Sequence, residues 1–149
     1  MEGCVFCKMF TGEVPARKVY EGRGVIGVLD IAPLFGQGQC VVIHRRHVDH
    51  FYDLDDEEVA ELFAGVKAVA RKIGAVFGGP HVSIYSRGMR ISDHAHILVY
   101  PSTGDGPIDK MMAAFVAALT LRGTTPSELD AMAEKIRAAS GPAEGDPAI

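Results

Sequence analysis

Apolar and polar positions along the chain predict a set of short strands around one long helix. Five runs rich in β-branched or aromatic residues predict strands, over residues 18–21, 25–30, 39–43, 81–86 and 93–101. The first two runs are separated by Gly22-Arg23-Gly24, a glycine-rich turn that predicts a hairpin. The third run is almost wholly apolar, as is typical of a central strand.

The long helix is predicted between the third and fourth strands, over residues 55–77. Asp55 and Glu58 have the spacing of a capping box, and Gly78-Gly79-Pro80 ends the pattern. Apolar residues recur at three- and four-residue steps, namely Val59, Leu62, Phe63, Val66, Val69, Ala70, Ile73, Val76 and Phe77. We assign this stripe to the core and give it no chemical role.

Two more helices are expected after the last strand, over residues 107–122 and 126–139. Each begins at a proline, and Thr125 with Glu128 forms a second capping box. An apolar stripe on the first of them, suited to packing on this chain or on a second copy, consists of Ile108, Met111, Met112, Phe115, Val116 and Leu119. The pattern predicts an α+β fold with an antiparallel sheet of about five strands, as one domain over 1–140 with a disordered tail at 141–149.

Composition limits the functions that the domain can have. The chain has 149 residues, a formal net charge of -4 and a pI near 5.8. Because no long basic block occurs, we expect neither a nucleic acid polymer nor an anionic membrane as partner, although a mononucleotide needs only a local positive site. The apolar runs are too short to span a bilayer, and Met1-Glu2-Gly3-Cys4 lacks a basic start followed by an apolar core, so we expect a cytoplasmic protein.

The last predicted strand carries the first candidate for chemistry. Side chains alternate along a strand, so His94, His96 and Leu98 should share one face and the residues between them should face the core. Buried strands favour apolar residues. Two neighbouring imidazoles therefore need a hydrogen-bonding, metal or substrate role.

Two further patterns suggest a site. Cys4 and Cys7 have the spacing of two thiolates on one zinc ion, which is half of a tetrahedral site. The alternatives are two buried small side chains or a thioredoxin-like pair, but no strand-like run precedes Cys4 as a thioredoxin-like motif requires. Asp30 ends a strand, where it would accept hydrogen bonds from a ligand or cap the bend at Ala32-Pro33.

Taken together, these motifs resemble the histidine triad (HIT) family. The likeness covers about the first two thirds of the chain and lies in four segments, Cys4-Val5-Phe6-Cys7, Asp30-Ile31-Ala32-Pro33, His44-Arg45-Arg46-His47-Val48 and Asp93-His94-Ala95-His96-Ile97-Leu98-Val99-Tyr100-Pro101. Leu98 replaces the third histidine. The resemblance implies a HIT-like fold and a homodimer, for which the long helix offers a contact.

The same resemblance implies the ligands of a site. His47 and His94 would complete a structural zinc site with Cys4 and Cys7, and Asp30 would bind the ribose hydroxyls of a nucleotide. The base would lie in a pocket of residues that would equally suit any core, Val5, Phe6, Met9, Val28 and Ile31. The ligand would be a purine mononucleotide or a dinucleoside polyphosphate.

Several positions depart from the family pattern. Gln39 stands in place of a histidine near the reacting phosphate, and His44 in place of a proline. Ser86 and Arg90 stand where the family has asparagine and glutamine, and we expect them near the nucleotide. Arg90 and its neighbour Arg87 would pair with phosphate or remain solvated loop residues. His50 and His81 are expected at the surface.

The resemblance implies a reaction in which His96 attacks the α-phosphorus of a nucleoside phosphoramidate or dinucleoside polyphosphate. A nucleotidyl-histidine would form, and water or another acceptor would resolve it. Three classes stay open. They are a nucleotide hydrolase or nucleotidyltransferase slowed by the loss of donors at Leu98 and Gln39, a nucleotide-binding or sensing protein without turnover, and a zinc-stabilised interaction protein.

Overall fold

The computed structural model describes residues 3–79, 81–86, 94–102, 104–119 and 125–139. Its helices are α1 (Val5–Thr11), the 3-10 helix η1 (Phe51–Asp53), α2 (Asp56–Phe77), α3 (Pro107–Leu119) and α4 (Pro126–Ala138). Its strands are β1 (Lys18–Gly22), β2 (Val25–Leu29), β3 (Cys40–His44), β4 (Val82–Ser86) and β5 (His96–Pro101). No helix in the described part of the chain has both the length and the apolar character needed to cross a bilayer.

The strands form one sheet in the order β1-β2-β3-β5-β4, in which every neighbouring pair is antiparallel. This confirms the predicted α+β class with a five-stranded antiparallel sheet. The hairpin turn between β1 and β2 contains Gly24, whose φ of 65° is a left-handed conformation that glycine adopts at little cost. The outer strands are β1 and β4.

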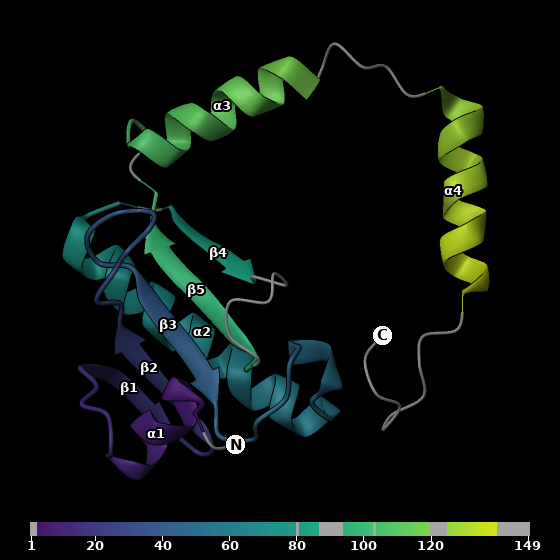
Figure 1. The fold of residues 1–149 in the computed structure, drawn as a ribbon. Coiled ribbons are helices and arrows are strands. Elements are labelled where there is room, and N and C mark those ends of the chain that lie inside the picture. The colour runs from purple at the N-terminus through teal and green to yellow at the C-terminus, as the bar shows by residue number, and fades with distance from the viewer. Residues whose placement is uncertain (1–2, 80, 87–93, 103, 120–124, 140–149) are drawn as a thin grey trace.

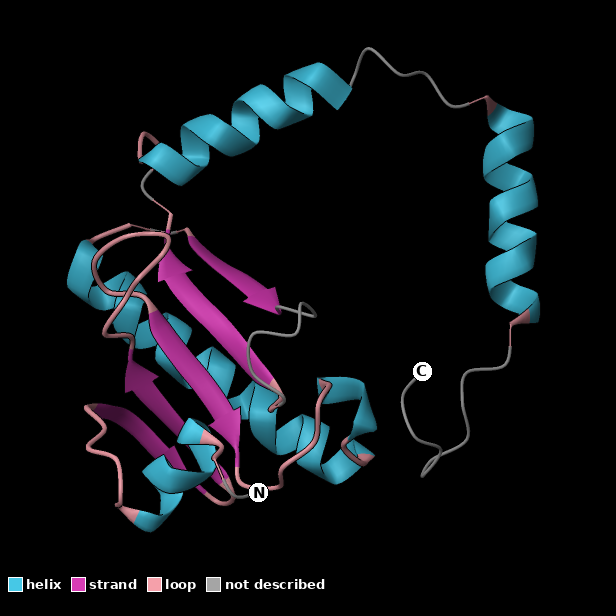
Figure 2. Ribbon diagram, in the orientation of Figure 1, coloured by secondary structure: helices cyan, strands magenta, loops and turns pink. Residues whose placement is uncertain are grey.

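Helix α2 covers one face of the sheet, and α1 with the loops around it lies against the other (Figures 1 and 2). The face toward α2 is apolar and includes Val25, Val42, Ile97 and Val99, packed on Leu62, Val66, Val69 and Ile73. The face toward α1 carries a second cluster, Ile26, Val28, Val41, Ile43 and Leu98. Since the first cluster occupies the α2 side, any site built on the sheet lies on the α1 side.

The ends of α2 follow the sequence prediction. The Asp55 side chain accepts from the Glu58 N–H at 2.8 Å, and the Glu58 side chain accepts from the Asp55 N–H at 3.0 Å. Gly78 ends the helix in a left-handed conformation. The reciprocal cap satisfies two backbone donors that the first turn of a helix otherwise leaves unpaired.

Helices α3 and α4 leave the top of the sheet after β5 and extend away from it (Figure 1). On α3, the side chains of Met111, Met112 and Phe115 are each about half exposed. The described apolar stripe of α3 is therefore not packed on this chain's own sheet. The predicted tail at 141–149 lies outside the described residues.

Two local expectations were incomplete. Helix α1 was not predicted, since seven residues give too short a pattern to separate from a loop. The last strand begins at His96, not at residue 93 or 94, because the Ala95 N–H donates to the Val48 carbonyl at 2.6 Å and not to a strand. His94 thus lies in the bend before β5.

Two glycines of α2 give a matched test of the helix–sheet packing. A Cβ on Gly65 would lie 2.8 Å from Val25 Cγ1 and 3.2 Å from Tyr20 Cε1, whereas a Cβ on Gly74 would have its nearest neighbour at 3.5 Å. We expect Gly65→Ala to lower the free energy of unfolding by about 1–3 kcal/mol through overpacking. Gly74→Ala should be neutral or raise it by up to about 1 kcal/mol, because alanine favours a helix. Urea denaturation of both variants measures the difference, and equal effects would contradict the close packing at Gly65.

Candidate functional site: a cysteine–histidine cluster beside a cavity

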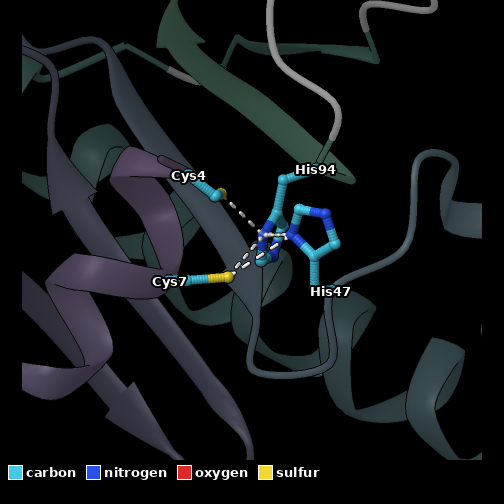
Figure 3. A group of neighbouring side chains, drawn as sticks. All are labelled: Cys4, Cys7, His47 and His94. Carbon is cyan, nitrogen blue, oxygen red and sulfur yellow. Dashed lines mark hydrogen bonds between the residues drawn. The ribbon is translucent and has the colours of Figure 1, made fainter. Parts of the chain in front are cut away.

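Four side chains from three parts of the chain meet at the lower end of the sheet. Cys4 and Cys7 come from the start of α1, His47 follows β3, and His94 precedes β5 (Figure 3). One ligand atom from each lies within 4.8 Å of every other. The structure thus brings together all four residues predicted as metal ligands.

The spacing of these atoms fits a tetrahedral ion. Cys4 Sγ lies 3.4 Å from His94 Nδ1, Cys7 Sγ lies 3.4 Å from His47 Nδ1, and the two Nδ1 atoms are 3.1 Å apart. Zinc bonds of about 2.3 Å to sulfur and about 2.0 Å to nitrogen give tetrahedral edges of about 3.5 Å between S and N and about 3.3 Å between two N atoms. Both the donor set and its dimensions therefore suit zinc.

The ring of His94 is held in the orientation that a metal ligand needs. Its Nε2 donates to the His44 carbonyl oxygen at 2.8 Å, so the proton lies on Nε2 and Nδ1 faces the two sulfurs. Burial lowers the pKa of His94, which favours the neutral ring. Burial, together with the neighbouring Cys4 thiol, raises the pKa of Cys7, and a bound cation would oppose that effect.

His96 is oriented by the same segment. Its Nδ1 lies 2.9 Å from the His94 carbonyl oxygen, which fixes the proton on Nδ1 and the lone pair on Nε2. Phe6 contacts both rings, with centroid distances of 5.7 Å to His94 and 5.2 Å to His96. The two imidazoles thus lie on the same side of the sheet, as the alternation predicted, and this is the side that α1 covers.

A cavity of about 380 Å³ opens beside His96, between α1 and the sheet. Seven of the nine residues predicted to bind nucleotide line it, Val5, Phe6, Met9, Val28, Asp30, Ile31 and Gln39. His96 and Leu98 lie in the same wall. The apolar walls suit a planar base, and Asp30 is the one carboxylate among the described lining residues.

Asp30 is held in place by two groups of the loop that follows it. Its Oδ1 accepts from the Ala32 N–H at 2.9 Å, and its Oδ2 accepts from the side-chain amide of Gln39. The Gln39 amide oxygen in turn accepts from the Phe35 N–H at 2.9 Å. Gln39 is 1% exposed, and its side-chain amide is bonded to Asp30, the acid expected to bind ribose. This amide therefore does not point toward the expected position of the phosphate.

One of the predicted nucleotide ligands, Ser86, is not brought into this cavity. Ser86 pairs with Ile97, which faces α2, so the register places it on the opposite side of the sheet from His96. Arg90 and its neighbour Arg87 lie outside the described residues. His81 is exposed and His50 stacks on Tyr52, with ring centroids 4.8 Å apart, so neither is part of the site.

Other residues of the site were not predicted. The cavity is also lined by Val14, Pro15, Ala16, Arg17, Leu34 and Val41, most of them on loops without periodicity. His44 supplies the carbonyl that orients His94, and its own Nε2 lies 3.7 Å from Glu61 Oε2 on α2. Main-chain contacts of this kind cannot be predicted from the residue types in the sequence. The replacement of proline at position 44 was visible, but its consequence was not.

Comparison with known proteins agrees with this geometry. The model of the HIT domain family matches residues 11–102. An uncharacterized HIT-like protein of Methanocaldococcus jannaschii is 34% identical over 115 residues, covering 72% of this chain and 85% of that protein. An adenosine 5'-monophosphoramidase of Schizosaccharomyces pombe is 30% identical over 106 residues, covering 68% of this chain and 76% of that protein.

Similarity to solved structures extends to the whole fold. The crystal structure of a member of the HIT family from Bacillus subtilis superposes with a TM-score of 0.73 at 26% identity, covering 94% of this chain and all of that one. Sequence, fold and the position of the histidine segment therefore lead to one assignment: the chain belongs to the HIT family.

Proposed function

We propose that the protein is a nucleotide hydrolase or nucleotidyltransferase that acts at the α-phosphorus of a purine nucleotide through His96. Adenosine 5'-phosphoramidate and dinucleoside polyphosphates are the substrate classes first to be tested. The relative named an adenosine 5'-monophosphoramidase supports the choice of the phosphoramidate.

One observation carries this proposal: His96 and Asp30 line the same cavity. A carboxylate accepts two hydrogen bonds from neighbouring hydroxyls, so Asp30 is suited to the ribose end of a nucleotide. The apolar residues beside Asp30 would hold the base. In the proposed mode of binding, the 5'-phosphate of the nucleotide would point toward His96.

The chemistry follows from the tautomer of His96. Because Nδ1 carries the proton that bonds the His94 carbonyl, Nε2 has the lone pair that attacks phosphorus. A bond forms between Nε2 and the α-phosphorus while the bond to the leaving group breaks. Water then attacks the phosphorus, which releases the nucleotide and restores the imidazole.

We also propose that Cys4, Cys7, His47 and His94 hold a structural zinc ion. The four ligand atoms support this through their distances and through the His44 carbonyl that orients His94. With four protein ligands, no position is open for water, so the ion would stabilise the fold and not react. The zinc ion would connect α1 to the neighbouring ends of β3 and β5.

A second function on the same fold is nucleotide binding without turnover. It is favoured by Leu98, which can neither donate a proton nor stabilise negative charge, and by Gln39, whose amide is bonded to Asp30. Each lost donor costs about 10²- to 10³-fold in rate. The absence of measurable turnover, together with tight binding of a mononucleotide, would favour this second function.

The decisive experiment is incubation of the purified protein with adenosine 5'-phosphoramidate or diadenosine tetraphosphate, with chromatographic detection of released AMP. Slow release, with a covalent adenylyl-protein species trapped by acid-free quenching, is the expected result. Binding of AMP without release from any tested nucleotide would leave the hydrolase proposal wrong and support the second function.

The homodimer expected from the resemblance remains a prediction. Two features suit it: β4 is an outer strand, on which Ile84 is 52% exposed, and the described stripe on α3 is solvent-accessible. Edge strands with exposed apolar residues tend to pair with another chain. We propose that β4 and α3 both contribute to the contact.

A further inference from the structure

His44 is a buried histidine whose ring has no part in the proposed reaction. It is 5% exposed and ends β3, where it pairs with Val25 of β2. Its neighbour Ile43 belongs to the cluster on the α1 side of the sheet, so by alternation the His44 ring lies on the α2 side, away from the cavity. A buried imidazole needs partners for its ring nitrogens. The partners of His44 therefore indicate what the ring does.

Both nitrogens of the His44 ring face a polar group. Nδ1 accepts a hydrogen bond from the Arg46 N–H at 3.1 Å, so in the neutral ring the proton lies on Nε2. That nitrogen lies 3.7 Å from Oε2 of Glu61 on α2, and Oε1 of the same carboxylate lies 3.4 Å from Arg23 Nε. A Cβ on Gly24 would be 3.0 Å from both His44 Nε2 and Glu61 Oε2. The carboxylate beside Nε2 thus favours the tautomer in which Nδ1 is an acceptor.

The same acceptor fixes the turn that leads from β3 to His47. Three successive polar groups of the main chain each have a partner there. The His44 carbonyl accepts from His94 Nε2 at 2.8 Å. The Arg45 N–H donates to the turn between β1 and β2 at 2.6 Å, and the Arg46 N–H donates to the His44 ring. Because His47 comes next in the chain, the ring of His44 influences the position of both histidine ligands of the cluster.

Building on the proposed zinc site, we propose that His44 is a positioning residue of the four-ligand cluster. It is not itself one of the four ligands. Its Nδ1 acts as the acceptor that keeps the turn at 44–46 in one conformation, and so places His47 and orients His94 before a metal ion binds. Glu61 supports this role by keeping the proton of the ring on Nε2. Ligands that are already in place bind an ion more tightly, because less conformational entropy is lost on binding.

Two variants separate a ring that accepts a hydrogen bond from a ring that only fills space. The side chains of His44→Leu and His44→Asn have nearly the same shape, but only asparagine has an oxygen that can replace Nδ1. Each protein, as purified, is equilibrated with a chromophoric chelator that competes for zinc. We expect His44→Leu to lower zinc affinity by about 10- to 100-fold, the usual effect of losing a group behind a metal ligand, and His44→Asn by less than about fivefold. Equal affinities of the two variants would overturn the proposal.

Melting of the same proteins in excess chelator separates positioning from packing. Without metal, His44→Leu and His44→Asn should melt at closely similar temperatures, because Arg46 lies at the surface, where water can take its N–H in the leucine variant. With zinc, His44→Asn should melt at the higher temperature, since it binds the ion more tightly. A deficit of His44→Leu that is the same with and without metal would show a packing defect only and would contradict the proposal.

A double-mutant cycle tests whether Glu61 acts through His44. Glu61→Met should lower zinc affinity several-fold in the wild-type background and leave it unchanged beside His44→Asn, which has no Nε2. The control is Glu57→Met, which removes the same charge from an exposed acid that also pairs with Arg23, and it should leave zinc affinity unchanged. An equal loss from Glu61→Met in both backgrounds would show that Glu61 acts by its charge on the ion, and would remove it from the proposal.

Cobalt(II) in place of zinc reports the ligand geometry through its visible absorption. The wild-type protein and His44→Asn should give the same tetrahedral bands, and His44→Leu should give weaker or shifted ones. If the wild-type protein binds neither zinc nor cobalt, the zinc proposal is wrong and this inference falls with it. If all three proteins bind zinc equally well, the zinc proposal stands and only the role of His44 is wrong.

Discussion

The His96→Ala variant should release nucleotide at least about 10³-fold more slowly than the wild-type protein, since the group that bonds to phosphorus is gone. The cavity remains, so binding of AMP should change by less than about tenfold, because Asp30 and the apolar walls are untouched. Rates from chromatography and affinities from calorimetry measure the two effects separately. Labelled α-phosphate should attach to the wild-type protein and not to the variant.

A suitable control is His81→Ala, which removes an exposed histidine just before β4. Its activity and affinity should equal those of the wild-type protein. The smaller variant His96→Gly offers a further check, because added imidazole would fill the space and restore part of the rate. Full activity in His96→Ala would show that another group reacts with phosphorus.

The second large effect is expected from Cys4→Ser. Protein purified without added metal should carry about one zinc ion per chain, and the variant should carry close to none, because the site loses one of four ligands. Since binding of a structural metal contributes to folding, the variant should lose on the order of 3 kcal/mol of stability and roughly 10 °C in melting temperature. Mass spectrometry of the metal and calorimetric melting measure these effects.

Cys40→Ala is the matched control, because Cys40 is the third cysteine, is buried on β3 and is not part of the cluster. It should destabilise the fold through a small cavity yet keep the full zinc content. One zinc per chain in both variants would show that Cys4 is not a ligand. Metal-free wild-type protein would contradict the zinc proposal as a whole.

Much of the fold could be predicted because its signals are local. The capping box at Asp55 and Glu58, the stripe along α2 as far as Ile73 and the glycine turn before Val25 each lie within a few residues, and each is confirmed. The last two residues of the predicted stripe, Val76 and Phe77, are exposed and do not belong to the core. One missed boundary depends on a distant contact. The start of β5 is set by the hydrogen bond from the Ala95 N–H to the Val48 carbonyl. Helix α1 was missed for a different reason, because its seven residues are too few to show a helical pattern.

The site was predicted less evenly. The spacing of Cys4 and Cys7 predicted two of the metal ligands, whereas the two histidine ligands came from the family resemblance, because no spacing rule links Cys7 to His47 or His94. Ser86 was placed near the nucleotide by alignment alone, whereas the register with Ile97 turns it toward α2. Similarly, the bond from Gln39 to Asp30 depends on the path of the loop between them, which periodicity does not determine.

His94 serves two neighbours through two different parts of one residue. Its ring joins the cysteines, while its main-chain carbonyl receives the Nδ1 proton of His96. A shift of that backbone by a few tenths of an ångström would therefore disturb both partners at once. Engineering that aims to retune the reactive imidazole has to leave this peptide unit where it is, and substitutions in the bend at 94–95 are poor starting points for directed evolution.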